Sequence, residues 1–109
     1  MVKIFVCSPY RGDTKANIEQ ACGYCRQVID AGNIPIAPHV MFSNCLDDSV
    51  LEERTVGIQM GLELMELCSE VWVFGPPTEG MKFEIAKAEE LGITIKFHDQ
   101  KGQVDYDNH

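Results

Sequence analysis

The segment between residues 70 and 75 constrains the fold of this chain more than any other stretch. It reads Glu-Val-Trp-Val-Phe-Gly, a nearly continuous apolar run of the β-branched and aromatic residues typical of strands. A strand with one face in water alternates apolar and polar residues, whereas a strand without alternation needs cover on both faces. Pro76 and Pro77 then break the run. The segment therefore predicts a central strand of a parallel sheet with helices on both faces.

Short β-rich or extended runs alternate with longer helical patterns along the rest of the chain. Strands are predicted at residues 2–7, 34–39, 70–75 and 93–97, and helices at 14–31, 51–67 and 78–92. This order predicts an α/β fold, a small flavodoxin-like or Rossmann-like three-layer sandwich with a four- to five-stranded parallel sheet. The 109 residues allow one domain, spanning 1–109, in which residues 99–109 form a polar tail.

The helix predicted at residues 51–67 has a start signal and two apolar sides. Ser49 and Glu52 have capping-box spacing just before it. One side carries Ile58, Leu62 and Met65, and the other carries Met60, Leu64 and Leu67. One side can face the sheet and the other a second copy, so we expect a homo-oligomer, a dimer or larger. The alternative is a helix wedged between two others of the same chain.

Composition and charge argue against several classes of partner. The net charge of -8 disfavours a nucleic-acid polymer and an anionic membrane, and no apolar run is long enough to cross a bilayer. The first residues enter a strand pattern directly, so we expect a cytoplasmic protein. The chain contains no Gly-x-Gly-x-x-Gly and no P-loop, which argues against dinucleotide binding and triphosphate hydrolysis. No cofactor is expected.

The five cysteines do not form a metal-binding pattern. Only Cys22 and Cys25 are close in sequence, and no second pair follows at the spacing of a structural zinc site. Cys7 and Cys68 flank predicted strands and are interpreted as small buried apolar residues. The charged residues of the middle segment are interpreted as a capping cluster with surface ion pairs: Asp47, Asp48, Glu52, Glu53 and Arg54. No metal site is predicted.

Glu84 lies on the apolar face of the last predicted helix. Met81, Ile85 and Ala88 form that face, and Glu84 falls three residues after Met81 on the same stripe. A carboxylate there needs a partner, a hydrogen bond or a cleft, because burying an unpaired charge is prohibitive. The alternative is an acid at the edge of the stripe that reaches water.

Three segments that follow predicted strands are expected to meet. Ligands of open parallel sheets bind outside the carboxyl ends of the strands, where residues 8–13, 38–39 and 75–84 should converge. His39, in the second of these segments, is a candidate for proton transfer or a structural histidine.

Two of these segments start helices and contain groups that suit an anion. Arg11 and Gly12 offer a guanidinium and an accessible backbone. Thr78 and Gly80 offer a hydroxyl and free N–H groups in the same way. Glu84 would then lie about one turn inside its helix, facing the cleft above the sheet. A carboxylate so placed can attack an electrophilic carbon or activate water.

The segment that carries Glu84 resembles the nucleophile segment of the nucleoside 2-deoxyribosyltransferase-like superfamily. It reads Gly-Met-Lys-Phe-Glu-Ile-Ala-Lys-Ala over residues 80–88 and continues with Leu-Gly-Ile over residues 91–93. Residues 3–12, Lys-Ile-Phe-Val-Cys-Ser-Pro-Tyr-Arg-Gly, resemble the first strand and loop of that superfamily and of the related 2'-deoxynucleoside 5'-monophosphate N-glycosidases. The whole chain is similar to a compact phage- or bacteria-borne branch of the superfamily.

This resemblance implies a small-molecule nucleoside or nucleotide as partner and a role for each candidate residue. Glu84 would be the nucleophile that attacks the anomeric carbon, and Tyr10 would lie near the sugar and orient Glu84. Ser8, Arg11 and Gly12 would hold a phosphate. The other candidates for substrate binding are Pro9, His39, Gly75, Thr78, Gly80 and Met81.

The chain departs from the superfamily at the acid that handles the base. Transferases of the superfamily usually carry an aspartate a few residues before the glutamate, whereas residues 76–79 here read Pro-Pro-Thr-Glu, with Glu79 the only acid. The predicted function is an N-glycosidase or deoxyribosyltransferase-like activity on a nucleoside or nucleotide. The alternative is a non-catalytic binder, a sensor or a sequestering protein, of a nucleotide-derived ligand. A structural or interaction module is a third interpretation.

Overall fold

Strands and helices alternate along the chain as the sequence predicts. The computed structural model describes residues 1–99 and residue 101, so most of the predicted tail at 99–109 lies outside the described residues. The described elements are β1 (Lys3–Cys7), α1 (Thr14–Asp30), β2 (Ile34–Ile36), α2 (Pro38–Phe42), α3 (Leu51–Met65), β3 (Glu70–Phe74), α4 (Glu79–Leu91) and β4 (Thr94–His98).

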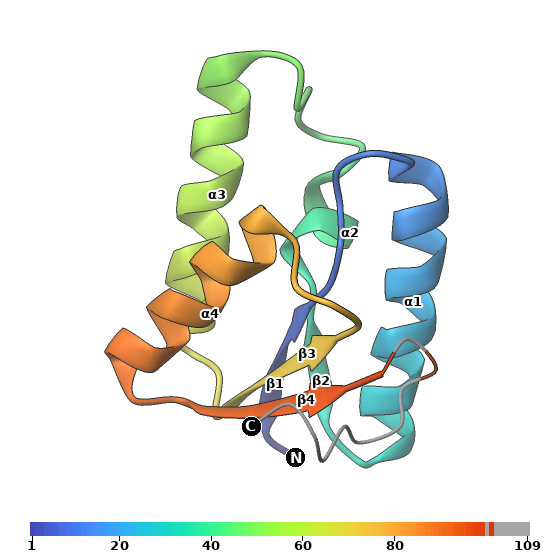
Figure 1. The fold of residues 1–109 in the computed structure, drawn as a ribbon, viewed down its shortest axis with the longest axis vertical. Coiled ribbons are helices and arrows are strands. Elements are labelled where there is room, and N and C mark those ends of the chain that lie inside the picture. Colours follow the sequence, from blue (N-terminus) through green and yellow to red (C-terminus); the bar gives the residue numbers. More distant parts are fainter. Residues whose placement is uncertain (100, 102–109) are drawn as a thin grey trace.

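The described strands form one four-stranded parallel sheet in the order β2-β1-β3-β4 (Figure 1). β1 and β3 are the inner strands, with Phe5 opposite Val71 and Cys7 opposite Val73. The prediction that residues 70–75 form a central strand is confirmed. Because all four strands are parallel, their carboxyl ends lie at one edge of the sheet.

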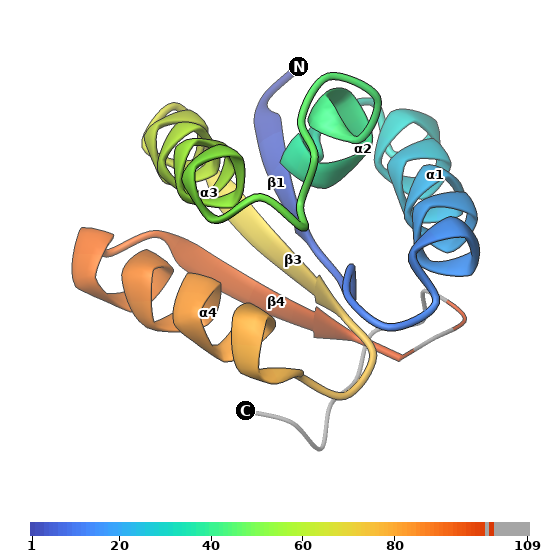
Figure 2. The same cartoon turned by 90° about the horizontal axis from the view of Figure 1, so that it is seen from above.

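Helices cover both faces of the sheet, which confirms the three-layer architecture (Figure 2). Phe5 and Cys7 of β1 pack with Met65 of α3 and Met81 of α4 on one face. The alternate residues of β1 face the other way and pack against α1 in a second cluster: Ile4, Val6, Tyr24, Val28 and Phe74. Side chains alternate across a strand, so the apolar run of each inner strand is buried on both sides.

Short-range signals set the ends of α4. The Thr78 hydroxyl accepts a hydrogen bond from the backbone N–H of Met81 at 3.3 Å, which satisfies one of the unpaired donors of the first turn. Gly92 ends the helix in the left-handed conformation, with φ of 72°. This conformation suits glycine because it has no Cβ to clash with the following carbonyl.

Two local predictions differ from the structure. Residues 38–39 are helical rather than extended, because Pro38 opens the short helix α2 as its first residue, where proline's fixed φ is compatible with a helix and its missing N–H is not needed. The capping box predicted at Ser49 is wrong, since the residue before α3 is Val50 and it makes no side-chain cap. The Ser49 hydroxyl instead donates to Asp47 at 2.6 Å, so it is already engaged in a local turn.

Gly92 and Gly23 provide a paired test of the backbone. Gly92→Ala should lower the free energy of unfolding by about 1 kcal/mol, because the alanine must adopt a left-handed conformation at φ of 72°. Gly23→Ala should raise it by roughly 0.5–1 kcal/mol, since Gly23 lies inside α1 and an added Cβ meets nothing within 4 Å. Urea denaturation of both variants measures the difference. Effects of the same sign would contradict this account.

Candidate active site

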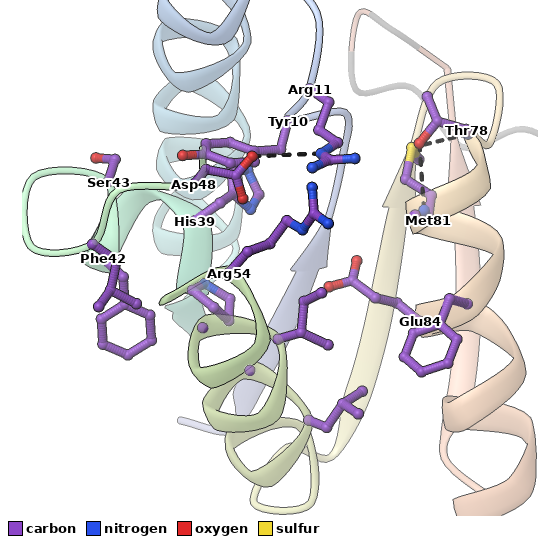
Figure 3. Close-up of a pocket in the computed structure, with 18 of the residues that line it drawn as sticks. Tyr10, Arg11, His39, Phe42, Ser43, Asp48, Arg54, Thr78, Met81 and Glu84 are labelled. Atoms are coloured by element: carbon purple, nitrogen blue, oxygen red, sulfur yellow. Dashed lines mark hydrogen bonds and ion pairs between the residues drawn. The ribbon is translucent and has the colours of Figure 1, made fainter. Parts of the chain in front are cut away.

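A cavity of about 550 Å³ lies at the carboxyl ends of the strands, where the three loop segments were predicted to meet (Figure 3). Its walls come from the β1–α1 loop, α2, the segment leading into α3, α3 itself, and the start of α4. The structure brings eight of the predicted site residues to this cavity: Ser8, Tyr10, Arg11, His39, Thr78, Gly80, Met81 and Glu84.

Three predicted site residues do not line the cavity. Pro9 lies in the loop between Ser8 and Tyr10, both of which do line it. Gly12 has a positive φ of 97° and turns the chain into α1, where its carbonyl accepts from Thr14 at 3.0 Å. Gly75 is buried and donates its N–H to the carbonyl of His98 at 2.9 Å. Gly12 and Gly75 therefore shape the loops around the cavity.

The Glu84 carboxyl group faces the cavity from α4 and is half-buried (Figure 3). Burial raises its pKa from 4.5 to about 7, because the charged form loses solvation, and a hydrogen bond from the Cys7 thiol opposes part of that shift. Cys7 itself is fully buried at the end of β1, and burial, followed by the nearby Glu84 charge, raises the pKa of its thiol well above the usual value. Glu84 therefore shares its buried surroundings with a thiol that stays protonated.

Ser8, His39 and Tyr10 form a connected group on the opposite side of the cavity. The Ser8 hydroxyl lies 3.2 Å from Nε2 of His39, and the rings of His39 and Tyr10 have centroids 5.4 Å apart. Burial lowers the pKa of His39 from 6.5 to about 4, so its imidazole is neutral at neutral pH. Burial, followed by the charge of Asp48, raises the pKa of Tyr10. Among the described residues no hydrogen bond joins Tyr10 to Glu84, and the two lie on opposite sides of the cavity (Figure 3).

Arg11 is held at the outer rim by an ion pair that the sequence did not indicate. Its Nε lies 3.4 Å from the Asp48 carboxylate, and the Arg11 side chain is 62% exposed. A second, open cavity of about 760 Å³ adjoins this rim and shares Tyr10, Arg11 and Arg54 with the first. The rim is therefore polar and accessible.

The wall formed by α2 and α3 was missed by the sequence analysis. It contributes several apolar side chains to the cavity: Phe42, Leu46, Ile58 and Leu62. Gly57 and Gly61 allow the segments to approach, since an added Cβ would lie 3.2 Å from Leu46 and 3.4 Å from Pro38. Two glycines four residues apart on a predicted helix were the available signal for this close contact.

Arg54 was also misassigned, because the structure places it in the cavity and not in a surface ion pair. It lies four residues before Ile58 and eight before Leu62, so it extends the inward apolar side of α3 by one turn. A charged residue on the apolar stripe of a helix is the same pattern that identified Glu84 on α4. The sequence therefore contained the signal for both charges.

The described part of the chain shows neither a metal-binding cluster nor a membrane-spanning helix. No group of three or more His, Cys, Asp or Glu side chains there is placed to hold a metal ion. None of the helices described combines the length and hydrophobicity needed to span a bilayer.

The fold is shared with 2-deoxyribosyltransferases. A 2-deoxyribosyltransferase from the psychrotolerant bacterium Bacillus psychrosaccharolyticus superposes with a TM-score of 0.68 at 18% identity, over 94% of this chain and 76% of that one. The 2-deoxyribosyltransferase of Leishmania mexicana gives a TM-score of 0.61 at 14% identity, over 91% of this chain and 65% of that one, less than two thirds of its length. At these identities the likeness establishes the α/β fold of this class.

Residues 2–98 match the family described as domain of unknown function DUF7768, and the chain belongs to that family. No curated protein matches the sequence.

The raised pKa of Glu84 makes the stability of the protein depend on pH. The unfolded chain loses this proton near pH 4.5 and the folded chain near pH 7, so the free energy of unfolding falls as pH rises between those values. Glu84→Gln cannot ionise and should be more stable than the wild type at pH 8 by about 1–3 kcal/mol. The difference should vanish well below pH 4.5, where Glu84 is neutral in both the folded and the unfolded chain.

Urea denaturation at pH 5 and pH 8 measures this effect. Glu89→Gln is the matched control, because Glu89 is exposed on the same helix. An equal difference between Glu84→Gln and the wild type at both pH values would contradict the assigned pKa.

Proposed function

We propose that this protein cleaves the N-glycosidic bond of a nucleoside or nucleotide, with Glu84 as the nucleophile. The observation that carries the proposal is the half-buried Glu84 carboxyl group, which faces a ligand-sized cavity from the first turns of α4. A cavity of about 550 Å³ lies within the range of small-molecule sites. The fold shared with 2-deoxyribosyltransferases supports the same reaction class.

The reaction would proceed in two displacements. The Glu84 carboxylate attacks the anomeric carbon, and the bond to the base breaks with its electron pair moving to the base nitrogen, which takes a proton from solvent. Water then attacks the anomeric carbon of the glycosyl ester, gives up a proton and releases the sugar, which restores the carboxylate. One water is consumed per bond cleaved. A second base in place of water would give transfer.

The other predicted residues would bind the substrate. Ser8 and Arg11 are proposed to contact a phosphate, and Thr78 and Gly80 to line the side nearest Glu84. The Tyr10 ring would contact the sugar from the opposite wall. His39, which is neutral at neutral pH, would act as a hydrogen-bonding group rather than as a cation.

Glu84→Gln should abolish base release, because the amide cannot form the glycosyl ester. We expect kcat to fall by roughly a thousandfold or more, whereas Glu89→Gln, on the same helix and exposed, should keep wild-type rates. The kcat/KM of the wild type should rise with pH and level off above about pH 7, since the nucleophile must be ionised. Free base released from nucleosides and 5'-monophosphates, separated by chromatography, is the measured quantity.

A non-catalytic nucleotide-binding protein is the second candidate. The observation that favours it is the position of Glu79, the only acid shortly before Glu84, whose side chain is 94% exposed and paired with Lys82 at 3.4 Å. An acid so exposed faces water rather than the interior of the cavity, so it is poorly placed to protonate a base bound there. If the wild type and Glu84→Gln release no base and bind a nucleotide equally in calorimetry, binding without turnover replaces the enzymatic proposal.

We also propose that the protein is a cytoplasmic homo-oligomer. Several large apolar side chains on α3 or directly after it are exposed and do not line the cavity: Leu51 at 65%, Val56 at 48% and Leu67 at 65%. Burying such a surface against a second copy is favourable. Sedimentation equilibrium should give a mass at least twice 12.2 kDa, and a monomer at all concentrations would contradict self-association.

A further inference from the structure

Arg54 is a cation inside the cavity that no part of the described chain neutralises. It lies in the first turn of α3, is half-buried, and extends its guanidinium between Arg11 and Glu84 (Figure 3). Its guanidinium makes no hydrogen bond or ion pair with any described residue. A half-buried guanidinium loses solvation without gaining a partner, which is unfavourable unless a ligand supplies the missing charge.

The acids that line the cavity are already engaged elsewhere. Asp48 pairs with Arg11 at 3.4 Å, and Glu79 pairs with Lys82 at 3.4 Å. The Glu53 carboxylate accepts the backbone N–H of Asp47 at 3.1 Å. The fourth acid, Glu84, lies beside the Cys7 thiol, whose hydrogen bond goes to the carbonyl of Met81 at 3.8 Å. None of these carboxylates lies within ion-pair distance of Arg54.

Arg54 is also the cation best placed to bind a ligand. His39 is neutral near pH 7, because burial lowers its pKa to about 4. Arg11 is largely exposed and shares its charge with Asp48. A guanidinium presents its N–H groups as a planar fork that matches two oxygens of a phosphate or carboxylate. Arg54 is therefore placed to bind the anionic group of a small molecule whose remaining part extends to Glu84.

We propose that Arg54 binds the phosphoryl group of the substrate and that the substrate is a nucleoside monophosphate rather than a free nucleoside. This inference rests on the proposed function for the position of the reacting carbon. Arg54 and Glu84 project from different helices into one cavity, so a single small molecule must contact both (Figure 3). A nucleotide meets this requirement because its phosphate and its glycosidic bond are attached to different carbons of the sugar. Arg11, at the rim, adds a second positive charge to the same end of the cavity.

Turnover of matched substrates tests the role of Arg54. Arg54→Ala should lower kcat/KM for deoxynucleoside 5'-monophosphates by about 10- to 100-fold, the usual effect of losing a charged hydrogen bond, and leave the matching nucleosides within about twofold. Arg54→Lys should retain part of the wild-type kcat/KM for monophosphates, since lysine keeps the positive charge but lacks the planar fork of N–H groups. Arg26→Ala is the control, because Arg26 lies on α1 in an exposed pair with Asp30. Equal losses on both substrates, or no loss on either, would overturn the inference.

Calorimetry separates this inference from the proposed function. Wild type, Arg54→Ala and Arg54→Lys are titrated with a deoxynucleoside 5'-monophosphate, with its nucleoside and with inorganic phosphate. We expect Arg54→Ala to weaken monophosphate binding by about 10- to 100-fold and nucleoside binding by less than twofold. If this holds while no base is released, the catalytic proposal fails and the assignment of Arg54 stands. If base is released from nucleosides and monophosphates at equal rates, and Arg54→Ala changes neither, catalysis stands and the assignment of Arg54 fails.

Discussion

The burial of β1 and β3 on both faces is the constraint on which the rest of the structure depends. Phe5 and Cys7 point to α3 and α4, and Ile4 and Val6 point to α1. Strands buried on both sides are typical of parallel sheets, whose strands are connected by helices that cross over the sheet. Those crossovers direct every strand to end at the same edge. The cavity therefore follows from the way the core is packed, and its residues are brought there from segments as distant as Ser8 and Glu84.

Two charged side chains that line the cavity are placed by the same helices that cover the sheet. Glu84 lies between Met81 and Ala88 on the buried side of α4, and Arg54 extends the inward side of α3 that contains Leu62 and Met65. In each helix the apolar stripe packs on the sheet, and the charged residue lies in the N-terminal half, which reaches the cavity. This arrangement holds both side chains on rigid elements, which fixes their positions more accurately than a loop would. It also explains the high pKa of Glu84, since a carboxyl group on a core-facing stripe loses solvation.

Sequence reasoning reached the fold and the location of the cavity because both depend on periodicity and on the geometry of parallel sheets. The continuous apolar run at 70–75 predicted the central strand, and the stripe on α4 identified Glu84. Local hydrogen-bond competition was less predictable. Ser49 has the spacing of a helix cap, but its hydroxyl donates a hydrogen bond to the nearby Asp47 carboxylate instead. Arg54 was read as a surface residue because the neighbouring acids offered plausible partners, and only the three-dimensional structure shows that those acids pair elsewhere.

The position of Arg54 and Glu84 on different helices has a consequence for how binding energy would be used under the proposed function. A phosphate bound beside the carboxylate would raise the pKa of Glu84 further and weaken it as a nucleophile, because like charges disfavour ionisation. Held at Arg54, the phosphate would have its charge neutralised by a guanidinium that lies between Arg11 and Glu84. Binding energy from a part of the substrate that does not react can then be spent on orienting the anomeric carbon against the carboxylate. Burial makes the ionised form of Glu84 costly in this cavity, and binding energy from the phosphate would offset that cost. We therefore assign phosphate binding to Arg54, the lining cation that the described chain leaves without a partner.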